Sequence, residues 1–95
     1  MKNKGDYEAL YRAVLALETT EECEAFFSDL CTRLEIKAMA QRLEVAKMLS
    51  QKQVYNKIVE KTGASSATVS RVSRSLNHGE NGYKLILQRL EKQGL

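Results

Sequence analysis

The chain has 95 residues, of which 43% are hydrophobic and 28% are charged, and its formal net charge is +3. This length is enough for one small domain with a marginal core, and no apolar run approaches the roughly 18 residues of a membrane span. Residues 1–6 contain no apolar stretch of the signal-peptide type. Proline and tryptophan are absent and glycines are few, which favours helices throughout. We therefore expect a cytoplasmic, all-α protein without a membrane partner.

The basic residues are concentrated in the middle of the chain. Residues 1–40 hold five basic and eight acidic side chains, a net charge of −3, whereas residues 41–75 hold seven basic and two acidic ones, a net charge of +5. This asymmetry indicates that the middle segment faces a polyanion, although an ordinary solvated surface would carry the same charges.

Three helices are predicted in the first half of the chain. Apolar side chains recur at intervals of three and four over about residues 6–17, which predicts the first helix. Thr19 and Glu22 have the spacing of a capping box and predict the start of a second helix. Thr32 and Glu35 repeat this spacing, so we expect a turn near Cys31 and then a third helix.

The second half continues with three more helices. A further capping-box pattern, from Ser50 to Gln53, predicts the start of a fourth helix. This helix is expected to stop at Gly63, a residue able to adopt the left-handed conformation. Ser65 or Ser66 can cap a fifth helix. A turn over residues 77–82 precedes a last helix over residues 83–93.

The amino-terminal segments carry more apolar residues than a lone small domain can bury easily. Pairing with a second copy would cover them and would add to the core. We therefore expect a homodimer, with residues 1–50 as its dimerisation helices. The apolar residues in question are Tyr7, Leu10, Tyr11, Val14, Leu17, Phe26, Phe27, Leu30 and Leu34.

Residues 53–76 have the features of a helix-turn-helix. Gly63 lies where the turn requires a small residue, and apolar residues lie at matching offsets on both sides of it. The second helix begins with short polar side chains and carries two arginines, which suit base edges and phosphates in a major groove. A plain helical hairpin also favours glycine and serine at its corner. The residues that we expect to contact DNA are Lys57, Ser65, Ser66, Ala67, Thr68, Ser70, Arg71 and Arg74.

Residues 30–76 resemble the Trp repressor family, in particular its YerC/YecD-type Trp repressor-like proteins. The matching stretches are Arg42–Leu49, Gly63–Ala64, Ala67–Arg71 and Ser73–Leu76. The resemblance implies a six-helix Trp repressor-like fold in an intertwined homodimer with two helix-turn-helix units. It also implies that Asn56 meets the DNA backbone and that residues 1–95 form a single DNA-binding domain.

The resemblance further implies an effector pocket. In the family, tryptophan lies between two arginines and is also held by a threonine and a serine. The corresponding residues here are Arg42 and Arg71, with Thr32 and Ser75.

One departure argues against tryptophan as the corepressor. The family's glycine after the second arginine is replaced by Val72, whose side chain would fill the space that an indole ring needs. The chain also has one residue fewer between Leu49 and Lys57 than the family. A smaller effector, or no small-molecule cofactor at all, stays open.

No constellation of residues predicts an enzyme or a metal site. The sequence has no glycine-rich phosphate loop and no nucleophile with a candidate base. Cys23 and Cys31 fit neither a disulfide framework nor a set of metal ligands, and we expect them to be buried and reduced.

The favoured function is therefore a nucleoid-associated transcription regulator, acting as a repressor, that binds specific duplex DNA. The alternatives are a protein–protein adaptor that uses the same basic surface and a DNA-binding module of the replication-initiator type.

Overall fold

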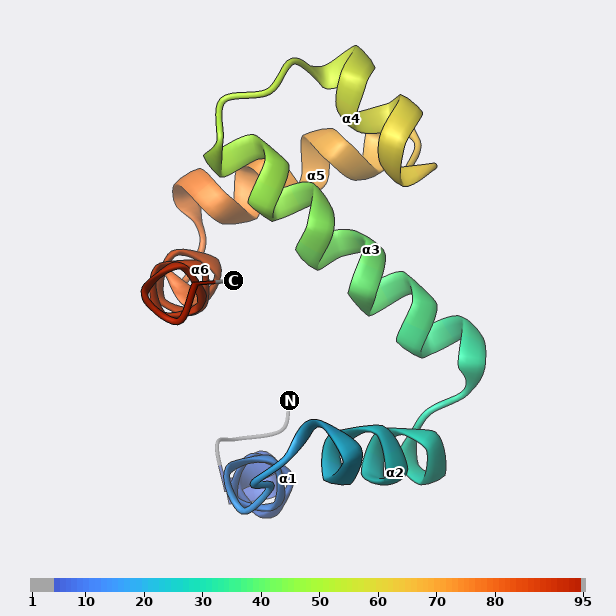
Figure 1. Ribbon diagram of the computed structural model, residues 1–95, viewed down its shortest axis with the longest axis vertical. Helices are drawn as coiled ribbons and strands as arrows, with labels where there is room; N and C mark the ends of the chain where they lie inside the picture. Colours follow the sequence, from blue (N-terminus) through green and yellow to red (C-terminus); the bar gives the residue numbers. More distant parts are fainter. Residues whose placement is uncertain (1–4, 95) are drawn as a thin grey trace. The chain divides into compact units, whose positions relative to one another are not determined.

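The computed structural model describes residues 5–94 and contains six α-helices and no strands within them (Figure 1). The prediction of an all-helical fold with six helices is confirmed. The chain divides into two compact units between Ile36 and Lys37. The helices are α1 (Gly5–Leu15), α2 (Thr20–Leu30), α3 (Arg33–Ser50), α4 (Tyr55–Thr62), α5 (Ser66–His78) and α6 (Gly82–Lys92).

Two helices, α2 and α3, begin at the predicted caps. The hydroxyl of Thr19 accepts a hydrogen bond from the amide of Glu22 at 3.0 Å, at the start of α2. At the start of α3, the Thr32 hydroxyl accepts from the Glu35 amide, and the Glu35 carboxylate accepts from the Thr32 amide, at 3.1 and 2.7 Å. Each pairing satisfies amide groups that the first helical turn leaves without partners.

The amino-terminal unit lacks a core of its own, because no described side chain before Val45 is buried. Cys23 and Cys31 are free thiols, as expected, but both are half-exposed. The prediction that they are buried is wrong for the single chain, since α2, which ends at Leu30, buries no residue.

The predicted capping box at Ser50 is also wrong. Ser50 is the last residue of α3, and its hydroxyl donates to the carbonyl of Lys47 at 2.7 Å. The helix ends because Lys52 takes a left-handed conformation, with a φ of 65°, and the amide of Gln53 donates back to the carbonyl of Met48. This pattern of bonds closes a helix rather than opening one. The fourth helix therefore begins at Tyr55, later than the box predicted.

The core lies within the carboxyl-terminal unit, where α5 packs against α4 and α6, and the second half of α3 joins them (Figure 1). Tyr83 and Leu87 of α6 cover this core from one side. The core therefore holds α4 and α5 on α3. The buried side chains are Val45, Ala46, Met48, Ile58, Ala64, Val69, Val72 and Leu76.

A three-residue turn joins α4 to α5. Gly63 ends α4 with a φ of +76°, and its amide donates to the carbonyl of Val59. Ser65 then caps α5, because its hydroxyl accepts from the amide of Thr68 at 3.1 Å. The predicted glycine corner and serine cap are both confirmed.

Substitution of Gly63 by alanine is expected to lower the free energy of unfolding by about 1–2 kcal/mol, the cost of a side chain in the left-handed region. The nearest atom to an added Cβ is Gln41 Nε2 at 3.9 Å, an ordinary contact, so the backbone alone causes the loss. Urea denaturation measures it. Gly82→Ala is the control, because its added Cβ meets nothing within 4 Å. Equal stability of the two variants would contradict this account of the turn.

None of the helices within the described residues, 5–94, has the length and hydropathy that a membrane span requires. No group of three histidine, cysteine or acidic side chains within the same residues is arranged to hold a metal ion.

Candidate functional site

The amino-terminal half of α5 presents a polar surface to solvent. Val69, Val72 and Leu76 recur at intervals of three and four and face the core, which leaves the opposite side of the helix exposed. Thr68 is half-buried at the edge of this surface. The predicted DNA-contacting residues that are exposed in this part of the chain are Ser65, Ser66, Ala67, Ser70, Arg71 and Arg74.

Within residues 5–94, no ion pair neutralises the basic side chains near this surface. Asn56 and Lys57 are exposed on the first turn of α4, and Arg71 and Arg74 are exposed on α5. Among the residues that the structure describes, the one ion pair joins Arg12 to Glu8, on α1. The α4–α5 surface therefore keeps its positive charge available for an anionic partner.

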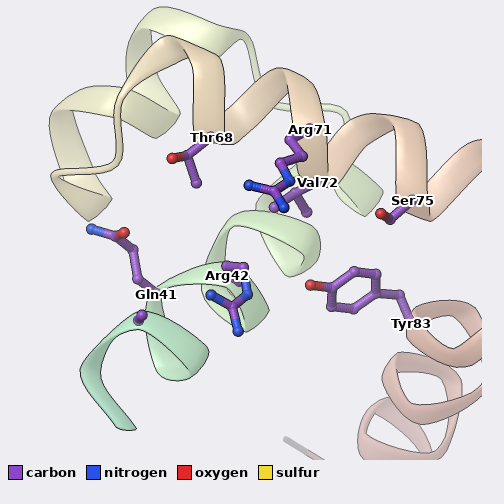
Figure 2. Close-up of a pocket in the computed structure, with 8 residues that line it drawn as sticks. Gln41, Arg42, Thr68, Arg71, Val72, Ser75 and Tyr83 are labelled. Atoms are coloured by element: carbon purple, nitrogen blue, oxygen red, sulfur yellow. The ribbon is translucent and has the colours of Figure 1, made fainter. Parts of the chain in front are cut away.

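A pocket of about 490 Å³ lies beside this surface, where α3, α5 and α6 approach one another (Figure 2). It contains four of the five residues predicted for an effector pocket. Arg42 comes from α3, and Arg71, Val72 and Ser75 come from α5. The fifth, Thr32, belongs to the amino-terminal unit, where its hydroxyl caps the Glu35 amide.

Figure 2 shows how the polar groups enter the pocket. The side chain of Arg71 extends from α5 toward α3, and the hydroxyl of Tyr83 points from α6 toward the space beside Arg42. Val72 forms part of the wall and is also buried in the core. That its side chain prevents an indole ring from entering stays a prediction.

Four residues that line the pocket were not predicted for it, and one of them, Thr68, was expected to contact DNA instead. Ala38 and Gln41 lie one turn or less before Arg42 on α3, so helical spacing alone could have pointed to them. Gln41 also holds α4 in place, because its Nε2 donates to the carbonyl of Thr62 at 3.1 Å. Tyr83 gave no comparable signal, since its position depends on how α6 packs against the core.

The comparisons with known proteins agree with this arrangement. Residues 5–91 match the family model described as Trp repressor protein. The chain is 48% identical over 87 residues to the uncharacterized protein YerC of Bacillus subtilis (strain 168), covering 92% of this chain and 84% of YerC.

Solved structures also resemble the chain. It superposes with a TM-score of 0.90 on the crystal structure of a TrpR like protein from Eubacterium eligens ATCC 27750, at 48% identity. This match covers 94% of this chain and 92% of the other. The crystal structure of a putative Trp repressor from Staphylococcus aureus matches with the same TM-score, at 47% identity. That match covers 94% of this chain and 89% of the other. The sequence, the helices and their packing thus all match those of Trp repressor-like proteins, and the chain belongs to the Trp repressor family.

Proposed function

We propose that the protein is a transcription regulator that binds specific duplex DNA as a homodimer, in the cytoplasm and at the nucleoid. In this proposal, α4, the turn at Gly63 and α5 form a helix-turn-helix, and the start of α5 enters the major groove. The other family members are the precedent for such a role.

One observation carries the proposal: the exposed side of α5 combines short hydroxyl side chains near its start with two arginines that form no ion pair within residues 5–94. The hydroxyls of Ser66 and Ser70 can bond to base edges or to bridging waters, and Ala67 permits close approach. Arg71 and Arg74 supply positive charge for phosphates. Asn56 and Lys57, at the start of α4, add contacts to the backbone of the DNA.

The homodimer is supported by the exposed apolar side chains of the amino-terminal unit. A monomer rarely leaves so many large apolar residues in water within one short segment. A second copy that covers them would place the two α5 helices of the dimer so that each can contact one of two DNA half-sites about 34 Å apart. The exposed residues are Tyr7, Leu10, Tyr11, Val14, Leu15, Leu30 and Leu34.

Two alanine substitutions test the DNA-binding surface. Arg71→Ala is expected to weaken binding to all duplexes by about ten-fold, because it removes a charge-assisted contact to phosphate. Thr68→Ala is expected to change the preferred base at one position, at a cost of about 1–3 kcal/mol for the original site. Fluorescence anisotropy on duplexes selected from random sequence, repeated over a salt titration, measures both effects.

Arg89→Ala is the matched control, since Arg89 is an exposed arginine of α6 outside the α4–α5 surface. Failure of the wild type to bind any duplex would favour an adaptor that uses the basic surface to hold an acidic protein. Short palindromes among the selected sequences are the result expected of a regulator rather than of a replication-initiator module.

A further inference from the structure

The segment between α5 and α6 contains the one asparagine of the sequence that is followed by a glycine. Asn81 lies directly before α6, and Gly82 is the first residue of that helix. The side-chain carbonyl carbon of an asparagine can close a ring with the backbone nitrogen of the next residue. A glycine at that next position lacks the Cβ that would hinder the closure. The pair therefore combines an electrophilic carbon with an unhindered nucleophile.

The structure leaves both reacting groups accessible. Asn81 and Gly82 are exposed, and the side chain of Asn81 makes no capping hydrogen bond to α6. Within residues 5–94, no backbone carbonyl accepts from the Gly82 amide, as is usual for the first residue of a helix. A Cβ added at Gly82 would meet nothing within 4 Å, so a ring that forms there has room.

The backbone at Asn81 can leave its present conformation at low cost. Its φ of 67° lies in the left-handed region, which is unfavourable for a residue with a side chain. One helix bond, from the Leu85 amide to the Asn81 carbonyl at 3.0 Å, opposes rotation of the peptide that joins Asn81 to Gly82. Helix ends fray locally, so this bond can open while the core stays intact.

We propose that Asn81 is a site of spontaneous deamidation in the folded protein, with water as the co-reactant. The backbone nitrogen of Gly82 loses its proton and bonds to Cγ of Asn81, while the bond from Cγ to Nδ2 breaks and the side-chain nitrogen leaves as ammonia. Water then opens the cyclic imide at either of its carbonyl carbons. The products are aspartate and isoaspartate at position 81.

Both products place a new carboxylate directly before α6. Negative charge is favourable at the amino-terminal end of a helix, so the aspartate product suits this position. The isoaspartate product instead adds a methylene group to the backbone between α5 and α6. Because Tyr83 and Leu87 of α6 pack against the core, this longer connection changes how α6 joins it.

Two other exposed asparagines serve as references within the same chain. The Nδ2 of Asn77 donates to the carbonyl of Ser73 at 3.0 Å, and the next residue still belongs to α5. The backbone amide that follows Asn56, that of Lys57, donates to the carbonyl of Val54 at 3.1 Å. Each reference therefore has a reacting group held by a hydrogen bond, which the Asn81–Gly82 pair lacks.

The experiment incubates the folded, full-length protein at neutral pH and follows each asparagine over several weeks by peptide mass mapping after digestion at low pH. Asn81 is expected to convert at least about ten-fold faster than Asn77, whose amide must first give up its hydrogen bonds. Gly82→Ala is expected to lower the rate at position 81 to that of Asn56 and Asn77. Glu80→Ala is the matched control, because it changes an exposed neighbour and leaves the reacting pair intact.

Thermal melting checks that each variant is folded, and a sample kept in urea gives the rates for the unfolded chain. Conversion of Asn81 in urea but not in the folded protein would overturn the proposal. It is also overturned if Asn81 converts no faster than Asn77, or if Gly82→Ala reacts as fast as the wild type. Loss of DNA binding by the protein would leave these rates unaffected, so the proposal stands or falls independently of the proposed function.

Discussion

Substitution of Ile58 by alanine is expected to lower the free energy of unfolding by about 2–5 kcal/mol, the range for a truncated core aliphatic residue. Ile58 is 0% exposed and lies at the centre of the core that joins α4 to α3 and α5. The loss is a large fraction of the stability of a small domain. Urea denaturation followed by circular dichroism measures it, and duplex binding should fall in parallel because α4 supports α5.

Val54→Ala is the control for this prediction. Val54 is also a branched aliphatic residue, directly before α4, but it is 67% exposed. Its truncation is expected to change the free energy of unfolding by less than about 0.5 kcal/mol. Similar losses in both variants would mean that the core does not extend between α3, α4 and α5 as the structure shows.

If the protein forms the proposed homodimer, the double substitution Tyr11→Glu and Leu15→Glu is expected to convert it to a monomer and to reduce affinity for a palindromic duplex by at least about 100-fold. The two side chains lie one turn apart on α1 and are 58% and 83% exposed, so the change leaves the core of the single chain intact. A charge buried at an interface without a partner is costly. Loss of the second half-site then removes the advantage of bivalent binding. Analytical ultracentrifugation and anisotropy measure the two effects.

Arg12→Glu supplies the matched control, because it changes the charge of α1 by the same two units at an exposed position. It removes one surface ion pair with Glu8, whose contribution is at most about 1 kcal/mol. We expect it to remain a dimer. A wild type that sediments as a monomer at micromolar concentration, or a double variant that stays dimeric, would refute the proposed role of this surface.

Local signals predicted the fold well wherever a few neighbouring residues decide the structure. Thr19, Thr32 and Ser65 cap helices as expected, because a cap needs only a side-chain oxygen and an amide three residues later. Ser50 shows the limit of this reasoning. It carries the same pattern, but α3 continues to it and ends through the left-handed Lys52, a residue type that does not signal such an ending.

The candidate site was less predictable because it depends on contacts between helices. The exposed start of α5 follows from the spacing of Val69 and Val72, which helical periodicity places in the core. The presence of Arg42 and Arg71 in one pocket was expected from the family resemblance, since no spacing links residues on different helices. Tyr83 joins them only through the packing of α6 against the core, for which the sequence near Tyr83 contains no local signal.

The uneven distribution of buried side chains has a consequence for biosynthesis. A ribosome releases residues up to Ile36 first, and this part of the chain contains no described buried side chain. The segment that emerges next can form a core from its own residues. Nascent chains on one messenger therefore present their uncovered apolar helices to one another before translation ends. Co-translational assembly on a shared polysome would give these helices a partner and shorten the time during which they could aggregate.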